Sequence, residues 1–571
     1  MIAGSSPSRQ AGIGDEPDTD KTAVLLCSDL WDTGHCPLPA AEIAAAVRGR
    51  APGVRVFVVE NLCSSPAGFT AAVRAVGGRR VAIGCRQGAA RRDEIAAQLR
   101  KAGIHRSGIR VVDLMPAGQP DPLSVAGQSA ARILAAVARV SHADLDAPVR
   151  ERPVGAAGPV SRRNLLHVGN LSHRPVACWV DDRCDGSGCR RACVAACPHG
   201  ALRLTGSGVA VDPAACTGCG ACLGTCRSDA MTLSGWSIGE TEAAADALIA
   251  EARRLGPASV RGVAIVCARA VASVPVGSSW LPLEVASLEM ASAGWPLQIL
   301  SAGLGVAIIG CDDDACARHG RELDSICAEL ASRAAPGWRR LSDRLAGWEP
   351  ANFSSSERTD VQPAAPVRLR EPAATATALS ALISRVTEPA VQTPGAAAGP
   401  AAPPADTDRS GQWRIESLAA PLGEVIVDAA RCSGCGSCAL ACPTGALQAE
   451  HTDGPALALS VDASECSACG VCVVSCPEGA VSLRRVLDSA SLVAGRQAVG
   501  EVVVSGRCES CGGPLAGGLA GGVVGLRLAA SHPEIADRLR HEVRCTDCLL
   551  VARVPGKRTS PTRDDEAEQW T

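Results

Sequence analysis

Two cysteine-rich blocks constrain this chain of 571 residues more than any other feature. Sixteen of its 29 cysteines fall in these blocks. In the second block, two runs share the spacing Cys-x2-Cys-x2-Cys-x3-Cys-Pro, which is the spacing of bacterial iron–sulfur motifs. Two such runs in series argue against a disulfide framework or a zinc knot. They predict two [4Fe-4S] clusters and one-electron chemistry.

Each cubane cluster needs four thiolates, and the loop Cys-x2-Cys-x2-Cys supplies three of them. The fourth comes from the other run, because the two halves pack about a pseudo-twofold axis. This crossed rule predicts one cluster on Cys432, Cys435, Cys438 and Cys476, and another on Cys466, Cys469, Cys472 and Cys442. The small residues between these cysteines would let backbone N–H groups approach the cluster sulfurs and tune the potential.

The first block repeats the pattern less regularly. Its second run has the usual spacing, but Arg227 follows the last cysteine instead of proline, and its first run has longer gaps. The crossed rule predicts a cluster on Cys216, Cys219, Cys222 and Cys197, and a second set on Cys184, Cys189, Cys193 and Cys226. The altered spacing leaves a shifted cubane, a three-iron cluster or no cluster open for the second set, so we expect three to four [4Fe-4S] clusters. Cys178 is a spare ligand or a buried thiol.

Two further Cys-x2-Cys pairs lie near the C-terminus, namely Cys508, Cys511, Cys545 and Cys548. Four thiolates in two knuckles suit a tetrahedral structural Zn²⁺. The 33 residues between the pairs exceed the usual ribbon gap, so a mononuclear iron or an unmetallated redox site is the alternative.

Alternating strand-like and helix-like segments flank the first block, and this order predicts parallel sheets with crossover helices. VAIGC at 81–85 and AIIGC at 307–311 each precede a polar loop and a helical segment, which indicates a partial internal repeat. Residues 281–294 are expected to form a helix between two strands.

Both cysteine blocks resemble the two-[4Fe-4S] ferredoxin domains that occur as modules in hydrogenases and heterodisulfide reductases. The α/β stretches resemble the small delta subunit of methyl-viologen-reducing hydrogenase, the partner of heterodisulfide reductase. Residues 59–91 and 284–320 carry this second resemblance, with a helix ending in Gly, a strand and a Gly-Cys turn in that family's order. In that family, cysteines of this region hold a [2Fe-2S] cluster and pass electrons between subunits.

Transferred residue by residue, the resemblance implies a [2Fe-2S] cluster on Cys27, Cys36, Cys63 and Cys85. The second stretch offers Cys267, Cys311 and Cys316, and has Ser278-Ser279 where the Cys63 loop would fall. A second copy with a purely structural role is therefore the alternative.

The sequence thus predicts two α+β ferredoxin-like modules, two α/β parallel-sheet domains and a small zinc-ribbon-like module. The expected divisions are 1–20 (disordered tail), 21–144 (α/β), 145–172 (linker), 173–236 (first ferredoxin domain), 237–349 (second α/β), 350–412 (Ala/Pro-rich linker), 413–486 (second ferredoxin domain), 500–555 (zinc-ribbon-like module with four cysteines) and 556–571 (disordered tail).

Composition narrows the function. The net charge of −3, with no long basic run, disfavours nucleic-acid binding. The first residues lack a secretory pattern, and the longest apolar stretch, 296–311, is too short to span a bilayer. Thiolate-ligated clusters need reduced cysteines, so a cytoplasmic setting is expected.

We therefore expect a multi-cluster electron-transfer protein, the ferredoxin-like subunit of a cytoplasmic hydrogenase- or heterodisulfide-reductase-like complex, with redox proteins or subunits as partners. No P-loop, Gly-x-Gly-x-x-Gly or His-Glu-x-x-His motif supports catalysis of its own. The alternative is a redox-sensing or scaffold iron–sulfur protein.

Overall fold

The computed structural model describes a large part of the chain. The described residues are 22–27, 40–59, 62, 69, 71–74, 77, 79–116, 122–154, 172–184, 192–206, 208–226, 228–334, 368, 372, 374–379, 414–417, 420–451 and 456–503. They belong to two compact units. The first lies within 1–186, 191–421 and 487–489, and the second within 187–190, 422–486 and 490–571.

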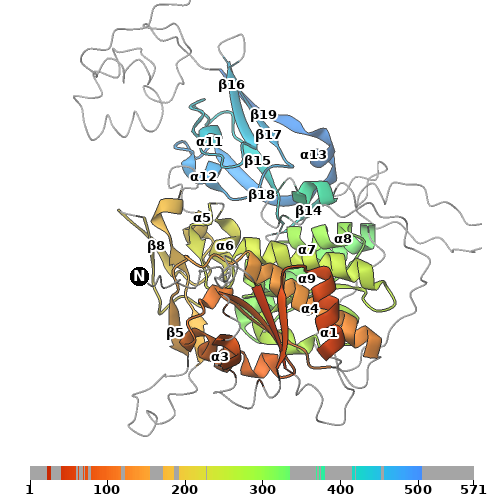
Figure 1. Ribbon diagram of the computed structural model, residues 1–571. Coiled ribbons are helices and arrows are strands. Elements are labelled where there is room, and N and C mark those ends of the chain that lie inside the picture. The colour runs from red at the N-terminus through yellow and green to blue at the C-terminus, as the bar shows by residue number, and fades with distance from the viewer. Residues whose placement is uncertain are drawn as a thin grey trace, which may run out of the picture. The chain divides into compact units, whose positions relative to one another are not determined.

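A four-stranded parallel sheet in the order β2-β1-β3-β4 forms the core of the first α/β domain (Figure 1, red and orange). Its elements are β1 (Thr22–Cys27), α1 (Ala40–Arg50), β2 (Arg55–Val59), β3 (Arg80–Cys85), α3 (Gly88–Lys101), η2 (Arg106–Gly108), β4 (Ile109–Asp113) and α4 (Pro122–Ser141). The central strand β1 is buried along its whole length because helices cover both faces of the sheet.

Alternate side chains of β1 pack on opposite faces. Val24 and Leu26 join one core with helices α1 and α4. Leu25 and Cys27 join another core with α3, which also contains Cys85 at the end of β3. The two described cysteines of this domain therefore lie on the same face of the sheet.

The second α/β domain has a three-stranded parallel sheet in the order β12-β11-β13. Its elements are α7 (Ile238–Leu255), β11 (Gly262–Cys267), η5 (Ala268–Ser273), β12 (Trp280–Val285), η6 (Leu288–Met290), α8 (Gly294–Ser301), β13 (Gly305–Ile309) and α9 (Asp314–Ala334). In both α/β domains the first strand along the chain lies between the second and the third. The predicted parallel sheets are present.

The helix expected over residues 281–294 is wrong. This segment forms most of β12, then the 3-10 helix η6 and the start of α8. Leu281, Leu283 and Val285 are buried, whereas Pro282 and Glu284 are less so, which is the two-residue period of a strand. Pro282 is tolerated because β12 is an edge strand, where a missing N–H breaks no sheet hydrogen bond.

Helices α4 and α7 pack against each other and join the two α/β domains. Three buried polar side chains of α4 donate to backbone carbonyl groups of the second domain. The pairs are Gln128 Nε2 with Ser259 (3.0 Å), Arg132 Nη2 with Pro275 (2.8 Å) and Arg139 Nη2 with Glu284 (2.6 Å). Because each donor satisfies a carbonyl oxygen, this polar stripe fixes the two domains in one register.

A buried ion pair lies in the same interface. Arg110 Nη2 is 3.5 Å from Glu240 Oε2, and the guanidinium stacks over Trp236 at 4.4 Å from the ring centroid. Burial lowers the pKa of Arg110 well below its usual value and raises the pKa of Glu240. Ser237 caps α7 by accepting from the Glu240 N–H, so the carboxylate enters the interface from a fixed first turn.

The first cysteine block also belongs to the first unit. Its elements are β7 (Cys178–Trp179), η4 (Asp181–Arg183), α5 (Ala192–Ala195), β8 (Leu202–Thr205), β9 (Gly208–Val211), α6 (Ala221–Thr225) and β10 (Met231–Thr232). β7 pairs antiparallel with β10, and β8 forms a hairpin with β9. Before the block, β5 (Glu151–Val154) pairs with β6 (Ser172–Pro175), so part of the expected linker is a strand.

The second unit has the same pairing scheme. Its elements, with the preceding strand β14 (Arg414–Glu416), are β15 (Gly423–Val427), α11 (Ser437–Leu440), β16 (Leu447–His451), β17 (Ala456–Asp462), α12 (Val471–Ser475), β18 (Val481–Asp488), α13 (Ser489–Ala494) and β19 (Arg496–Val503). β15 pairs antiparallel with β18, and β16 forms a hairpin with β17. Strand β19 adds to β17, so the sheet continues past residue 486, where the sequence analysis ended the domain.

Within the described residues, no helix has both the length and the apolar character that crossing a membrane requires.

The buried pair in the α/β interface can be tested by Glu240→Gln. This change leaves the fully buried Arg110 without its carboxylate, and we expect the free energy of unfolding to fall by about 3 kcal/mol or more. Denaturation followed by tryptophan fluorescence measures it. Glu94→Gln is the control, because its pair with Arg91 is exposed and worth under about 1 kcal/mol. Equal effects of the two changes would contradict the assignment.

Candidate iron-sulfur cluster sites

Four short helices carry the third cysteine of each run. Cys193 in α5, Cys222 in α6, Cys438 in α11 and Cys472 in α12 each occupy the second residue of the helix. The helices pack in pairs, α5 with α6 and α11 with α12. Each block therefore brings its two runs together through their third cysteines.

Left-handed residues shape the three regular Cys-x2-Cys-x2-Cys loops. In each loop the residues before and after the second cysteine have positive φ, namely Gly218 (70°) and Gly220 (81°), Gly434 (68°) and Gly436 (68°), and Ala468 (50°) and Gly470 (74°). Glycine adopts this conformation at little cost, whereas Ala468 carries a steric penalty of about 1 kcal/mol. The alternation of backbone direction turns the loop tightly around one point, as a cluster requires.

The turn after each fourth cysteine has one form in all four runs. The third residue after the cysteine is left-handed: Gly200 (61°), Asp229 (53°), Gly445 (70°) and Gly479 (58°). The next N–H groups donate to the cysteine sulfurs, Ala201 to Cys197 (3.3 Å), Met231 to Cys226 (3.4 Å), Leu447 to Cys442 (3.4 Å) and Ala480 to Cys476 (3.2 Å). The run that lacks the proline keeps the turn, with Asp229 in place of glycine.

In the second unit, one predicted ligand set lines an apolar cavity. Cys442, Cys466, Cys469 and Cys472 line it together with Val425, Leu447, Val461 and Leu483. Burial raises the pKa of Cys466 to about 11 and that of Cys472 to about 12. Burial acts in the same direction on Cys442, but donors from Leu447 and Thr444 outweigh it and lower the pKa.

The other predicted set of this unit is also brought together. Burial raises the pKa of Cys432 and raises that of Cys438 to about 11. The neighbouring thiols Cys435 and Cys476 act in the same direction on both, so the four cysteines lie close together. The thiol of Cys438 also contributes to the raised pKa of Cys472, which belongs to the neighbouring set. The two sets therefore lie side by side, as the crossed rule requires for two adjacent clusters.

The first block contains a similar apolar cavity. Cys197, Cys216, Cys219 and Cys222 line it, which is the ligand set expected by the crossed rule. Burial raises the pKa of Cys219 to about 12 and that of Cys222 well above its usual value. Each cavity is lined by four cysteines and by apolar side chains, so the two cavities suit the same kind of cluster.

Part of the second α/β domain lies against this cavity. A Cβ atom at Gly220 would lie 3.2 Å from the Met290 side chain, so Met290 of η6 covers the loop. Glu289 of η6 lies 3.4 Å from Nε2 of His199, a lining residue of the cavity. The 3-10 helix η6 therefore closes one side of the site.

The irregular set of the first block is only partly described. Cys193 and Cys226 are buried and Cys184 is half-buried, whereas Cys189 lies outside the described residues. Cys178 is buried, and its thiol lies 3.7 Å from the Val176 carbonyl oxygen. Its pKa is raised, mainly by burial. The choice between a full cubane and a smaller cluster here stays a prediction.

The cysteines of the α/β domains differ between the two domains. In the first, Cys27 and Cys85 are buried on one face, and Cys36 and Cys63 lie outside the described residues. In the second, Cys267, Cys311 and Cys316 meet, with all three Sγ atoms within 4.8 Å of one another. A hydrogen bond from Cys267 lowers the pKa of Cys316, and the same hydrogen bond together with burial raises the pKa of Cys267.

The C-terminal zinc-type cysteines, Cys508, Cys511, Cys545 and Cys548, lie outside the described residues, so that module stays a prediction.

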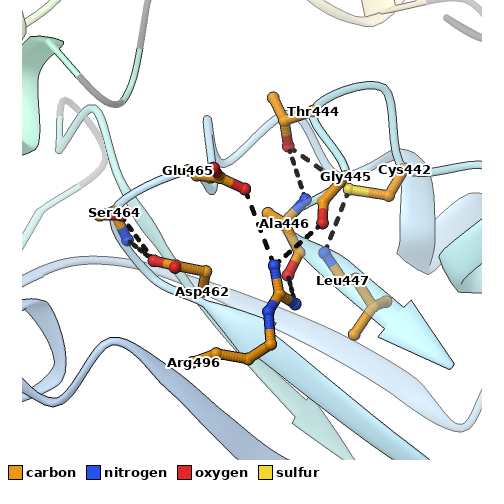
Figure 2. Close-up of polar contacts among 9 residues, drawn as sticks. All are labelled: Cys442, Thr444, Gly445, Ala446, Leu447, Asp462, Ser464, Glu465 and Arg496. Carbon is orange, nitrogen blue, oxygen red and sulfur yellow. Dashed lines mark hydrogen bonds and ion pairs between the residues drawn. The ribbon is translucent and has the colours of Figure 1, made fainter. Parts of the chain in front are cut away.

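Two arginines that the sequence analysis did not single out hold the fourth-cysteine turns. Figure 2 shows Arg496, at the start of β19, donating through Nη1 to the Ala446 carbonyl at 2.9 Å and through Nη2 to that of Gly445 at 3.4 Å. Its Nη2 also lies 3.8 Å from Glu465. This contact fixes the turn after Cys442.

Arg431 does the same for the turn after Cys476, since its Nη2 donates to the Glu478 carbonyl at 2.9 Å. Arg431 directly precedes a cysteine run, and this position in the sequence could have indicated that it contacts the cluster motif. Arg496 follows a helix outside the motif, so only the pairing of β19 with β17 brings it to the turn.

Comparison with known families identifies one of these regions. Residues 431–480 match the family model described as a 4Fe-4S dicluster domain. This segment is therefore an iron–sulfur domain with places for at least two [4Fe-4S] clusters. A search among curated proteins found no match for the chain.

The clamping arginines can be tested by Arg496→Met and Arg431→Met. Each change removes the donors to one turn, and we expect each variant to lose about four irons to a chelator several-fold faster than the wild type. The double variant should lose about eight in the fast phase. Iron release followed by absorbance measures it, and unchanged kinetics in both single variants would show that the turns need no clamp.

Proposed function

We propose that this protein is a multi-cluster electron carrier with two ferredoxin-like modules. On this proposal it serves as the iron–sulfur subunit of a cytoplasmic hydrogenase- or heterodisulfide-reductase-like oxidoreductase complex. The observation that supports it most is the pair of apolar cavities, one in each cysteine block and each lined by four cysteines.

The residues fit cubane clusters by their chemistry. Each cavity offers four thiol donors, an apolar lining and backbone N–H groups that donate to sulfur, which together match the requirements of a [4Fe-4S] cluster. When bound, such a cluster accepts and releases one electron. The protein holds the cluster, excludes water and tunes the potential through its N–H donors.

Adjacent ligand sets support relay of electrons within a module. Cys438 and Cys472 belong to different sets of the second unit and interact electrostatically, and the same holds for Cys193 and Cys222 of the first block. Because α11 packs against α12 and α5 against α6, each module would hold its two clusters next to each other. Electrons would then pass from cluster to cluster without leaving the module.

An exposed apolar residue beside each site of the second unit supports exchange with a partner protein. Leu440 is 89% exposed and Val474 is 73% exposed. Each follows the third cysteine of its run by two residues, on helices α11 and α12 respectively. Apolar side chains around a cluster suit a transient docking surface for a redox partner.

Metal analysis of protein purified without oxygen tests the proposal. We expect about sixteen irons per chain with equal sulfide if both modules carry two cubanes, and about twelve if the irregular set carries none. EPR of the reduced protein should show interacting [4Fe-4S] signals, and the reduced protein should pass electrons to methyl viologen. About eight irons would restrict the function to the second module, and a redox-silent protein would overturn it.

Cys472→Ser gives a sharper check of the ligand sets. We expect loss of about four irons with retention of the others, because only one set uses this thiolate. Cys178→Ser is the matched control: it removes another buried thiol that belongs to no predicted set, and the iron content should not change. Unchanged iron in Cys472→Ser would refute the assignment. Purification with a tagged chain, followed by measured electron transfer to the partner, tests the complex.

A further inference from the structure

Three cysteines from separate segments of the second α/β domain meet at one end of its sheet. Cys267 ends β11, Cys311 lies in the loop after β13, and Cys316 is in the first turn of α9. The carboxyl ends of parallel strands lie at the same edge of a sheet, so strands β11 and β13 deliver the first two cysteines to one place. The first turn of helix α9 brings the third cysteine, Cys316, to the same place.

The separation of the sulfurs indicates what they can bind. All three Sγ atoms lie within 4.8 Å of one another. Metal–sulfur bonds of about 2.3 Å in a tetrahedron place sulfurs about 3.8 Å apart around one ion. In an iron–sulfur cluster, terminal thiolates on different irons are held farther apart. Among the described cubane-motif cysteines, no three approach one another this closely.

The surroundings stabilise thiolates. The N–H groups of Leu288 and Cys311 donate to Cys316 Sγ. The N–H groups of Arg269 and Asp313 donate to Cys267 and Cys311 respectively. Three thiolates and a divalent ion sum to one negative charge, and the Arg269 guanidinium, which also pairs with Asp313 at 3.5 Å, lies beside Cys267. Such donors orient metal-bound thiolates.

We propose that Cys267, Cys311 and Cys316 bind a single soft divalent ion, of the Zn²⁺ or Fe²⁺ class, in a tetrahedral site. Cys267 and Cys316 are fully buried and Cys311 is half-buried, so the fourth position lies on the side of Cys311 and is taken by water. This inference does not rest on the proposed electron-transfer function.

The position of the serines supports one ion over a [2Fe-2S] cluster, which needs a fourth thiolate. Ser278-Ser279, expected in place of the Cys63 loop, lie before β12, at the sheet edge opposite Cys267. The loop that follows β12 instead contains Ser287, which lies beside Cys316 and donates its hydroxyl to Glu289 at 3.4 Å. Among the residues that the structure describes, no fourth cysteine, histidine or carboxylate joins the three thiols within 4.8 Å.

Reconstitution of the full chain with Co²⁺ or Zn²⁺ tests the proposal. We expect Cys311→Ser and Cys316→Ser each to lose about one divalent ion per chain, with no loss of inorganic sulfide. The Co²⁺ form should lose thiolate-to-metal charge-transfer absorption in the same variants. Cys311 is half-buried, so its replacement should fold even if that of Cys316 does not.

Two further variants complete the test. Cys27→Ser, at the matching end of β1 in the first domain, should leave the divalent ion in place. Ser287→Cys should supply a fourth thiolate and slow the loss of the ion to a chelator. Loss of about two irons and two sulfides in Cys311→Ser would replace the single ion by a [2Fe-2S] cluster and overturn the proposal. Unchanged metal content in both cysteine variants would also overturn it.

Discussion

Burial of ionisable sulfur is the constraint on which the cysteine blocks depend. The apolar linings that exclude water raise the pKa of Cys219, Cys466 and Cys472, so the thiolate form is costly there without positive charge nearby. Bound iron would supply that charge, and backbone N–H groups would supply the rest. The left-handed loop residues bring the cysteines together, and the N–H donors to sulfur stabilise their thiolate form. Cys442, with several donors, shows how far hydrogen bonds alone can offset burial.

The sequence was most informative where the chemistry fixes the spacing. The cysteine runs predicted which four thiols line each cavity, and the β-branched runs predicted the parallel strands. Residues 281–294 were misread because Leu281, Val285 and Leu288 also fit a helical period, and only the pairing with β11 decides for a strand. Contacts that join distant segments, such as Arg496 with the Cys442 turn, leave no local pattern.

The two α/β domains show how one strand order can serve different ends. In the first, Cys27 and Cys85 lie in an apolar core with Leu25 and Ile83. In the second, Cys311 is the second residue after β13 and lies half-buried outside the core, and Cys316 on α9 completes a cluster of thiols. Relative to the neighbouring strand, Cys311 lies one position later than Cys85 does. With this shift and with Cys316, the second domain has three thiols together where the first has a buried pair. The buried stripe of α4 holds the two domains together.

The 3-10 helix η6 has a consequence for the assembly of this protein. Its three residues contact two sites at once, since Leu288 donates to Cys316 and Met290 covers the loop around Cys219. A group bound at either site stabilises the fold that presents the other, because binding free energy adds to the stability of the shared segment. With a cluster in the first block and an ion at the three thiols, as proposed above, maturation of the block would be cooperative with metal loading of the neighbouring domain. The order in which a cell inserts the metals would then decide how much of the chain reaches its final form.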